Sequence, residues 1–190
     1  MVIVMKGLEC YLVGGAVRDR ILKRSIGDRD WVVVGSSPEE MMSLGFHPVG
    51  KKFPVYLHPE TKEEYALARR ETKVSKGHLG FEVDASATIT LEEDLLRRDI
   101  TINAIAEDLD GKLIDPFNGL TDIKNRLIRH VSQAFAEDPL RVFRVARFMA
   151  ELSEFKVADK TRELTLEMSQ DGALRELPAE RISTEMVKAL

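Results

Sequence analysis

The chain has 190 residues, of which 44% are hydrophobic and 32% are charged, with a formal net charge of −4. This length suits one domain or one domain with part of another, and the acidic balance excludes a generally basic nucleic-acid binder. The single cysteine, Cys10, excludes an internal disulfide. Because no secretory leader or membrane-spanning apolar stretch is present, we expect a soluble, cytoplasmic protein with no membrane partner.

Alternating strand and helix patterns fill residues 1–137. Gly14 and Gly15 follow a predicted strand, where two glycines allow the backbone to approach a ligand closely. Ser37 and Pro38 are typical of a helix start, as capping residue and first helical residue. The predicted strands are residues 11–13, 30–35, 55–57, 64–68 and, joined by a hairpin turn, 105–109 and 112–114. The predicted helices are residues 16–23, 38–44, 91–96, 101–106 and 120–127.

Residues 69–86 show no clear periodicity and are rich in basic side chains, so we expect a mobile basic loop. From Asp138 onward, strand patterns are absent and helical periodicity predicts helices at 139–152, 160–168 and 180–190. We therefore expect an α+β head with a mixed sheet over residues 1–137 and an all-α neck over residues 138–190. The last helix is still amphipathic where the sequence stops, which indicates a chain cut from a longer parent or an oligomer surface.

The most informative motif is a pair of aspartates, Asp28 and Asp30, which precede an apolar run over residues 31–34. Residues i and i+2 of a strand point to the same face, so the two carboxylates would aim at one point. Carboxylates in that arrangement suit Mg²⁺, which binds through one or two carboxylates together with substrate phosphates. The alternative is that both side chains are solvated, one in a loop and one at a strand start.

A second polar cluster contains Arg97 and Arg98 among acidic residues and includes Asn103 in an otherwise apolar run. The planar fork of an arginine matches the oxygens of a triphosphate, and the asparagine amide would bind a ribose or the backbone. The alternatives are a solvated ion-pair helix for the arginines and a satisfied core side chain for Asn103.

In a third cluster, Arg141, Arg144 and Arg147 recur every three residues and form a slowly drifting stripe on one helix face. Three like charges in one stripe repel each other unless an anion neutralises them, which favours anion binding. Asp138 lies one turn before Arg141 on the same side. Its alternative role is that of a helix N-cap before Pro139.

The motifs at residues 14–19, 28–30, 97–104 and 137–147 resemble, in order and spacing, those of the class II tRNA nucleotidyltransferases. These are the CCA-adding enzymes of the polymerase-β-type superfamily, and the resemblance covers essentially the whole chain. Bacterial poly(A) polymerases share the first three motifs, but residues 30–35 and 52–59 look like the CCA-adding branch.

The resemblance implies a polymerase-β-like nucleotidyltransferase head followed by neck helices. It also implies that Asp28 and Asp30 hold two Mg²⁺ ions for nucleotidyl transfer, with Glu64 as a candidate third carboxylate. The resemblance further implies a set of residues that bind the incoming nucleotide. They are Gly15, Arg18, Arg98, Asn103, Arg144 and Arg147.

Asp138 and Arg141 are the two residues implied to select the base. Cytosine and adenine present an exocyclic amine beside an unprotonated ring nitrogen, whereas uracil and guanine present a carbonyl beside an N–H group. A carboxylate that accepts from the amine and an arginine that donates to the ring nitrogen would therefore take CTP and ATP and refuse UTP and GTP. The resemblance thus implies addition of C, C and A to the 3′ end of tRNA, with pyrophosphate release.

Two other functions stay open from the sequence alone. One is a poly(A) polymerase, and the other is a non-catalytic RNA-binding head. The intact pair Asp28 and Asp30 argues against the non-catalytic head. Members of the CCA-adding family are commonly near twice this length, so a fragment would keep nucleotide binding better than addition to tRNA.

Overall fold

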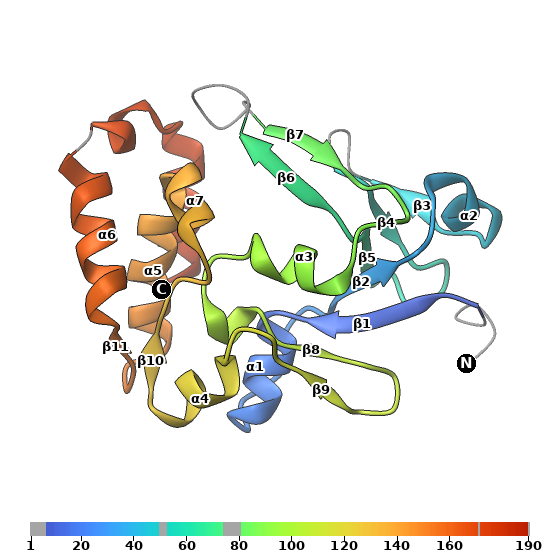
Figure 1. Cartoon of the computed structure of the whole chain (residues 1–190), viewed down its shortest axis with the longest axis horizontal. Helices are drawn as coiled ribbons and strands as arrows, with labels where there is room; N and C mark the ends of the chain where they lie inside the picture. Colours follow the sequence, from blue (N-terminus) through green and yellow to red (C-terminus); the bar gives the residue numbers. More distant parts are fainter. Residues whose placement is uncertain (1–6, 50–52, 74–80, 171, 190) are drawn as a thin grey trace.

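The computed structural model describes residues 7–49, 53–73, 81–170 and 172–189. Its largest sheet contains β1 Glu9–Val13, β2 Asp30–Val34, β3 His47–Pro48, β4 Val55–Leu57, β5 Glu64–Leu67, β8 Ala106–Glu107 and β9 Leu113–Ile114. These strands lie in the order β3-β4-β5-β2-β1-β8-β9 (Figure 1). β2 and β5 run parallel, whereas the other neighbours run antiparallel, so the expected mixed sheet is confirmed.

Short helices connect these strands. Gly14 precedes the first helix with φ of +75°, a conformation that favours glycine, and the Ser37 hydroxyl accepts from the Glu40 N–H at 3.2 Å as expected for a cap. Residues 101–106 do not form the expected helix, because only a 3₁₀ turn forms before Ala106 enters β8. The α-helices are α1 Gly15–Ile21, α2 Pro38–Ser43, α3 Leu91–Leu96 and α4 Gly119–Lys124. The 3₁₀ helices of the chain are Thr101–Asn103, Gln133–Glu137 and Ala173–Glu176.

The expected basic loop over residues 69–86 is in part an antiparallel hairpin, so that expectation was wrong for its two arms. Its strands are β6 Arg70–Lys73 and β7 Phe81–Asp84. Pairing satisfies backbone groups that a loop would leave to water, and an ion pair from Arg70 to Glu93 ties the hairpin to α3. Residues 74–80, to which the expectation of mobility also applied, lie outside the described residues.

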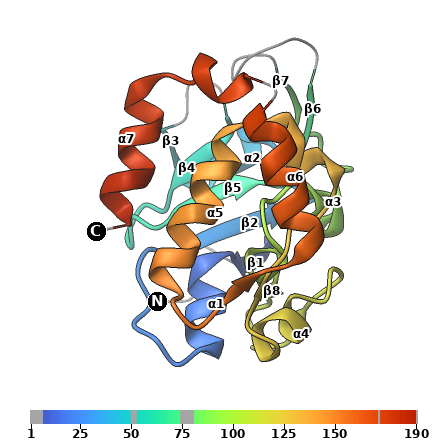
Figure 2. The same cartoon turned by 90° about the vertical axis from the view of Figure 1, so that its left-hand side faces the viewer.

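The helices after residue 138 lie together at one side of the sheet (Figure 1), and Figure 2 shows them from that side. They are α5 Leu140–Glu151, α6 Asp159–Gln170 and α7 Ala179–Lys188. The expectation of a purely helical neck was wrong in one element, since the short strands β10 Leu127–Ile128 and β11 Lys156–Val157 pair in parallel. This pairing satisfies the backbone where the chain turns from α5 to α6, with Lys156 N–H donating to the Arg126 carbonyl at 2.8 Å.

One apolar core joins the sheet side of the molecule to the helices. Buried Val17, Ile102 and Ile105 belong to the same packed cluster as Val145 and Phe148 of α5. The core is therefore continuous across residue 137, and the division into two domains there stays a prediction. Among the described residues, no helix is long and apolar enough to cross a membrane.

Candidate functional site

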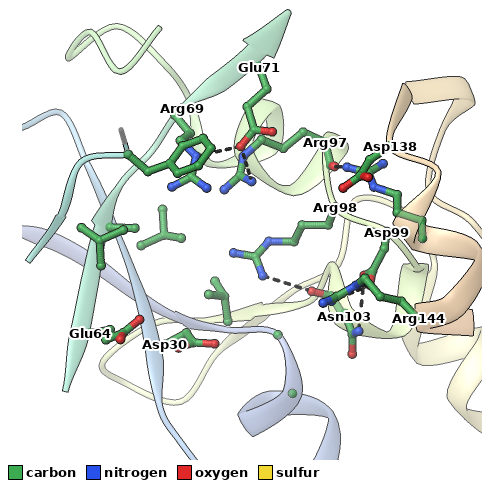
Figure 3. A pocket seen from close by; sticks show the side chains of 18 of the residues that line it. Asp30, Glu64, Arg69, Glu71, Arg97, Arg98, Asp99, Asn103, Asp138 and Arg144 are labelled. Atoms are coloured by element: carbon green, nitrogen blue, oxygen red, sulfur yellow. Dashed lines mark hydrogen bonds and ion pairs between the residues drawn. The ribbon is translucent and has the colours of Figure 1, made fainter. Parts of the chain in front are cut away.

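A cavity of about 490 Å³, called here the first cavity, opens between the sheet and the helices α5 and α7 (Figure 3). Its charged lining comes from segments that are far apart in the sequence. The acidic residues are Asp30, Glu64, Glu71, Asp99 and Asp138, and the basic residues are Arg69, Arg97, Arg98, Arg141, Arg144 and Arg181. Gly14, Gly15 and Asn103 also line it, as expected for Gly15 and Asn103.

Asp30 and Glu64 lie together at one end of the first cavity (Figure 3). They are direct partners in the parallel pairing of β2 with β5, so the two carboxylates are held by backbone register. Asp28 does not lie on the strand, which begins at Asp30, and it lines a second cavity of about 690 Å³ that also contains Asp30 and Glu64. The expectation that Asp28 and Asp30 share a strand face was therefore wrong, although both remain close to Glu64.

Burial and the neighbouring charges shift the pKa of Asp30. Burial is the largest cause and raises the pKa of Asp30 above its ordinary value. The positive charges of Arg98 and Lys188 lower this pKa, and the negative charges of Glu64 and Asp28 raise it further. A bound cation would relieve this repulsion, and carboxylate oxygens are the ligands that Mg²⁺ prefers. In the parts of the chain that the structure describes, no set of three or more such side chains is arranged to hold a metal without other ligands. The donor chemistry fits Mg²⁺ that also takes oxygens from a phosphate.

Arg98 extends across the middle of the first cavity (Figure 3). Its Nη2 donates to Asp94 at 3.2 Å, and its buried Nε has no hydrogen-bond partner among the described residues. A Cβ atom at Gly14 would lie 3.2 Å from Nη1 of Arg98, so glycine leaves room for this guanidinium. Its Nη1 makes only a long contact, 3.5 Å to the Asn103 carbonyl oxygen, so this nitrogen retains donor capacity for an anion.

Arg97 and Arg69 form a second basic wall around Glu71. Arg97 Nη1 and Arg69 Nε both donate to Oε1 of Glu71, at 3.1 and 2.9 Å. Arg97 also binds the fully buried Asp94, at 2.7 Å from Nη2. Burial alone would raise the pKa of Asp94, but Arg97 and Arg98 outweigh burial and lower it. The sequence analysis missed Arg69 and Glu71 as site residues, because their positions depend on the hairpin that it did not predict.

Arg144 lines the first cavity and is bound there to Asp99. Both Nε and Nη2 of Arg144 lie 2.7 Å from Oδ2 of Asp99, which is buried. Burial alone would raise the pKa of Asp99, but the charge and hydrogen bonds of Arg144 lower it. Asn103 donates to Asp99 at 3.4 Å and accepts from Arg18 Nη1 at 2.9 Å. Arg18, expected to bind the nucleotide, is buried and does not line the cavity, and its side chain contacts Asn103 instead.

Arg147 does not line the first cavity, in contrast to the expectation. Its Nε binds Glu185 of α7 at 2.7 Å, its Nη1 binds Glu151 at 2.6 Å, and it lies over the Phe148 ring. Three-residue spacing on an α-helix drifts by about 60° per step, so Arg147 is rotated by about 120° from Arg141. That rotation turns Arg147 from the cavity toward α7.

Asp138 and Arg141 both line the first cavity, but they do not bind each other through their side chains. Asp138 Oδ2 accepts from Arg181 of α7 at 3.0 Å, and Oδ1 accepts from the Leu140 N–H at 3.0 Å. Arg141 donates to the carbonyl oxygens of Ala134 and Arg97, at 3.0 and 2.6 Å. Asp138 therefore caps the start of α5 and faces the cavity, so the two alternatives are not exclusive.

The sequence analysis also missed Arg181 as a site residue. It lines the first cavity from α7, and Glu185 lies one turn further along the same helix, where it binds Arg144 and Arg147. The i, i+4 spacing of Arg181 and Glu185 on an amphipathic helix is the signal that would have indicated a shared polar face.

Three comparisons relate this geometry to known proteins. A family model described as the poly A polymerase head domain matches residues 10–129. The multifunctional CCA protein of Pasteurella multocida (strain Pm70) is 60% identical over 185 residues, which are 96% of this chain and 44% of that protein. The Bacillus stearothermophilus CCA-adding enzyme in complex with CTP matches with a TM-score of 0.82 and 36% identity, over 98% of this chain and 46% of that one.

A tRNA nucleotidyltransferase complexed with a primer tRNA and an incoming ATP analog also matches, with a TM-score of 0.73 and 34% identity, over 95% of this chain and 52% of that one. This chain thus spans about half the length of the relatives that it matches. The similarity extends through α5, α6 and α7, since 98% of the chain is covered. The resemblance to CCA-adding enzymes is therefore confirmed, and the chain belongs to the poly A polymerase head domain family.

Proposed function

We propose that this chain carries the nucleotidyl-transfer site of a CCA-adding enzyme, which adds C, C and A from CTP and ATP to the 3′ end of tRNA and releases pyrophosphate. The observation that carries the proposal is the first cavity itself, where the Asp30 and Glu64 carboxylates face a wall of arginines. Nucleotidyl transfer needs this combination, because its catalysis is mostly positioning and neutralisation of charge. The proposed tRNA substrate favours a cytoplasmic location.

Asp28 and Asp30 are the residues proposed to hold two Mg²⁺ ions, with Glu64 beside Asp30 as the third carboxylate. When bound, the ions would supply activation of the RNA 3′-hydroxyl and neutralisation of the triphosphate and the leaving pyrophosphate. The register of β2 with β5 pairs Asp30 with Glu64, so the two carboxylates come from neighbouring strands at one end of the first cavity.

The phosphates of the incoming nucleotide are proposed to bind Arg98 and Arg144. Arg98 lines the cavity with an Nη1 that makes only a long contact of 3.5 Å to the Asn103 carbonyl oxygen, and Asp99 fixes the guanidinium plane of Arg144. Gly15 lines the same cavity at the start of α1, where a small residue lets the nucleotide approach the backbone. Asn103, fixed by Arg18 and Asp99, is proposed to bind the ribose.

The base is proposed to lie against Asp138 and Arg141. The Asp138 carboxylate retains acceptor sites beyond those used by Leu140 and Arg181, because two carboxylate oxygens offer about four lone-pair directions. Arg141 commits Nη1 and Nη2 to backbone carbonyls, which holds its guanidinium rigid at the cavity wall. Together they favour bases with an exocyclic amine beside an unprotonated ring nitrogen.

A poly(A) polymerase is the second candidate, because the matching family model carries that description. Both candidates use the same carboxylates. They differ in the nucleotides that they add and in the RNA that accepts them.

Incorporation of labelled CTP into tRNA that lacks its 3′-terminal CCA tests the proposed function. The chain should incorporate CTP with Mg²⁺ but not with EDTA, and Asp30→Ala should reduce the rate by about a thousand-fold or more, since metal-ion catalysis is worth several kcal/mol. Asp110→Ala, in an exposed turn, is the matched control and should keep the activity. Incorporation that persists in Asp30→Ala, or in EDTA, would refute the proposed site.

A further inference from the structure

Asp30 and Glu64 line two cavities rather than one. The first cavity holds the arginines proposed to bind the nucleotide. The second cavity, of about 690 Å³, shares Asp30 and Glu64 with the first. The charged side chains that line only the second cavity are the acidic Asp28 and Glu63 and the basic Arg29, Lys62 and Lys188. Nucleotidyl transfer joins two substrates at these carboxylates. If the nucleotide occupies the first cavity, the second cavity is available to the RNA that accepts it.

Helix α7 contributes to both cavities. Arg181 near its start lines the first cavity, and Lys188 at its end lines the second. In Figure 2 the C-terminal end of α7 lies on the side of the sheet where β2 begins, in agreement with the shared lining of Lys188 and Asp30. The polar face of one helix thus follows the path that leads from the arginine wall past the carboxylates.

Lys188 differs from the other two basic residues of the second cavity in its contacts. Arg29 lies 3.7 Å from Glu63, and the Lys62 ammonium donates to the Pro59 carbonyl at 2.7 Å. The side-chain ammonium of Lys188 forms no hydrogen bond or ion pair with any residue in the described ranges. Its ammonium therefore keeps its three donors for a ligand.

We propose that Lys188 binds a phosphodiester group next to the 3′-terminal nucleotide of the acceptor RNA, in the second cavity. This inference rests on the proposed function and adds the acceptor side to it. A lysine suits this task, because its ammonium is a point charge that binds phosphate regardless of the base. The 3′-hydroxyl of an RNA held there would face Asp30 and Glu64 from the side opposite to the nucleotide phosphates.

Fluorescence anisotropy with a labelled single-stranded RNA hexamer that ends in a free 3′-hydroxyl tests the proposal without any need for turnover. Lys188→Ala should weaken RNA binding by roughly three- to ten-fold, as expected for one charge-assisted phosphate contact. It should also reduce the slope of log K against log salt by about 0.7, the value for one phosphate on a single strand. Lys188→Arg should restore the binding.

The matched control is Lys124→Ala, which removes one exposed positive charge at the end of α4. This variant should keep the RNA affinity and the salt slope, and CTP affinity should be unchanged in both variants. An equal loss of RNA affinity in Lys124→Ala would overturn the proposal, as would unchanged RNA binding in Lys188→Ala or a wild-type chain that does not bind the hexamer. Failure of the proposed function is distinguishable, because it would appear as absent incorporation by a wild-type chain that still binds the RNA.

Discussion

Arg144 holds Asp99 with two nitrogens, Nε and Nη2, each 2.7 Å from the same carboxylate oxygen. The pair joins α5 to the segment that follows α3, and Nη1 of Arg144 lies 3.5 Å from Glu185 of α7. Three segments that are distant in the sequence therefore meet at one guanidinium. The contact both holds the helices against the sheet side of the molecule and orients an arginine in the first cavity.

Asp99→Asn should destabilise the chain, because the partly exposed Arg144 then loses the nearer of its two carboxylate partners, at a cost of about 1–3 kcal/mol. Arg144 lowers the pKa of Asp99 against the effect of burial. The ionised carboxylate therefore contributes stability above the unfolded pKa of about 3.9, and this contribution is lost as pH falls through the lower native pKa. Urea unfolding at pH 7 and near pH 3 should show a difference from wild type that shrinks in acid. Equal stability at pH 7 would contradict the pairing.

Arg144 and Arg147 provide a matched pair of conservative substitutions. Arg144→Lys keeps the charge but loses the fork that lines the first cavity, so CTP binding should weaken roughly ten-fold. Arg147→Lys should leave CTP binding unchanged, since Arg147 faces Glu185 and Glu151. Titration calorimetry with CTP compares the two directly. If both variants lose CTP affinity equally, the assignment of Arg147 to the interface with α7 is wrong.

Asp30→Asn should abolish nucleotide addition without loss of stability in metal-free solution. The pKa of Asp30 is raised, mainly by burial and also by Glu64 and Asp28, so the ionised carboxylate disfavours the native state. Wild-type stability should therefore fall as pH rises from the unfolded pKa through the native pKa, and the asparagine variant should avoid this fall. Melting temperatures at pH 7 should be equal or higher in the variant, and the advantage should vanish below about pH 4. A clearly lower melting temperature of the Asp30→Asn variant at pH 7 would refute this prediction.

Local patterns were sufficient for the parts of the site that each motif places by itself. Gly15 begins a helix just after a strand, Asp30 begins a strand, and Asp138 precedes a helix, so their positions followed from neighbouring residues. Arg181 and Glu71 could not be found in this way. Arg181 reaches Asp138 from 43 positions along the chain, and Glu71 depends on the hairpin over residues 70–84.

The same limit explains the wrong expectations about the fold. Strand β11 has two residues and exists because its backbone meets β10, which no periodicity in the sequence signals. Asp28 satisfies the i, i+2 rule with Asp30, but the strand begins only at Asp30, where pairing with β5 begins. Strand ends are set by their partners, so a motif at a strand end is placed less reliably than one in its middle.

Asp138→Ala should relax base selection more than it slows transfer. A site built to hydrogen-bond an amine rejects a carbonyl because its own acceptor would be left unpaired, at roughly 1–3 kcal/mol. UTP and GTP should therefore gain relative to CTP and ATP when kcat/KM is measured for all four. Arg181→Ala is the matched control, because it removes the partner of Asp138 but keeps the acceptor, and it should retain the preference. If Asp138 acts only as a cap, its alanine variant should lose about 1 kcal/mol of stability with the preference intact.

Sequencing of the RNA product tests the central claim most directly. Transfer RNA that lacks its 3′-terminal CCA would be incubated with the chain, Mg²⁺ and all four nucleoside triphosphates, and the added nucleotides would be read from single molecules. A cavity that selects cytosine and adenine through Asp138 and Arg141 should yield 3′ ends with added C, then C, then A, and no U or G. A run of adenosines would assign the chain to poly(A) synthesis instead, and incorporation of U or G at rates equal to C and A would contradict the proposed base selection.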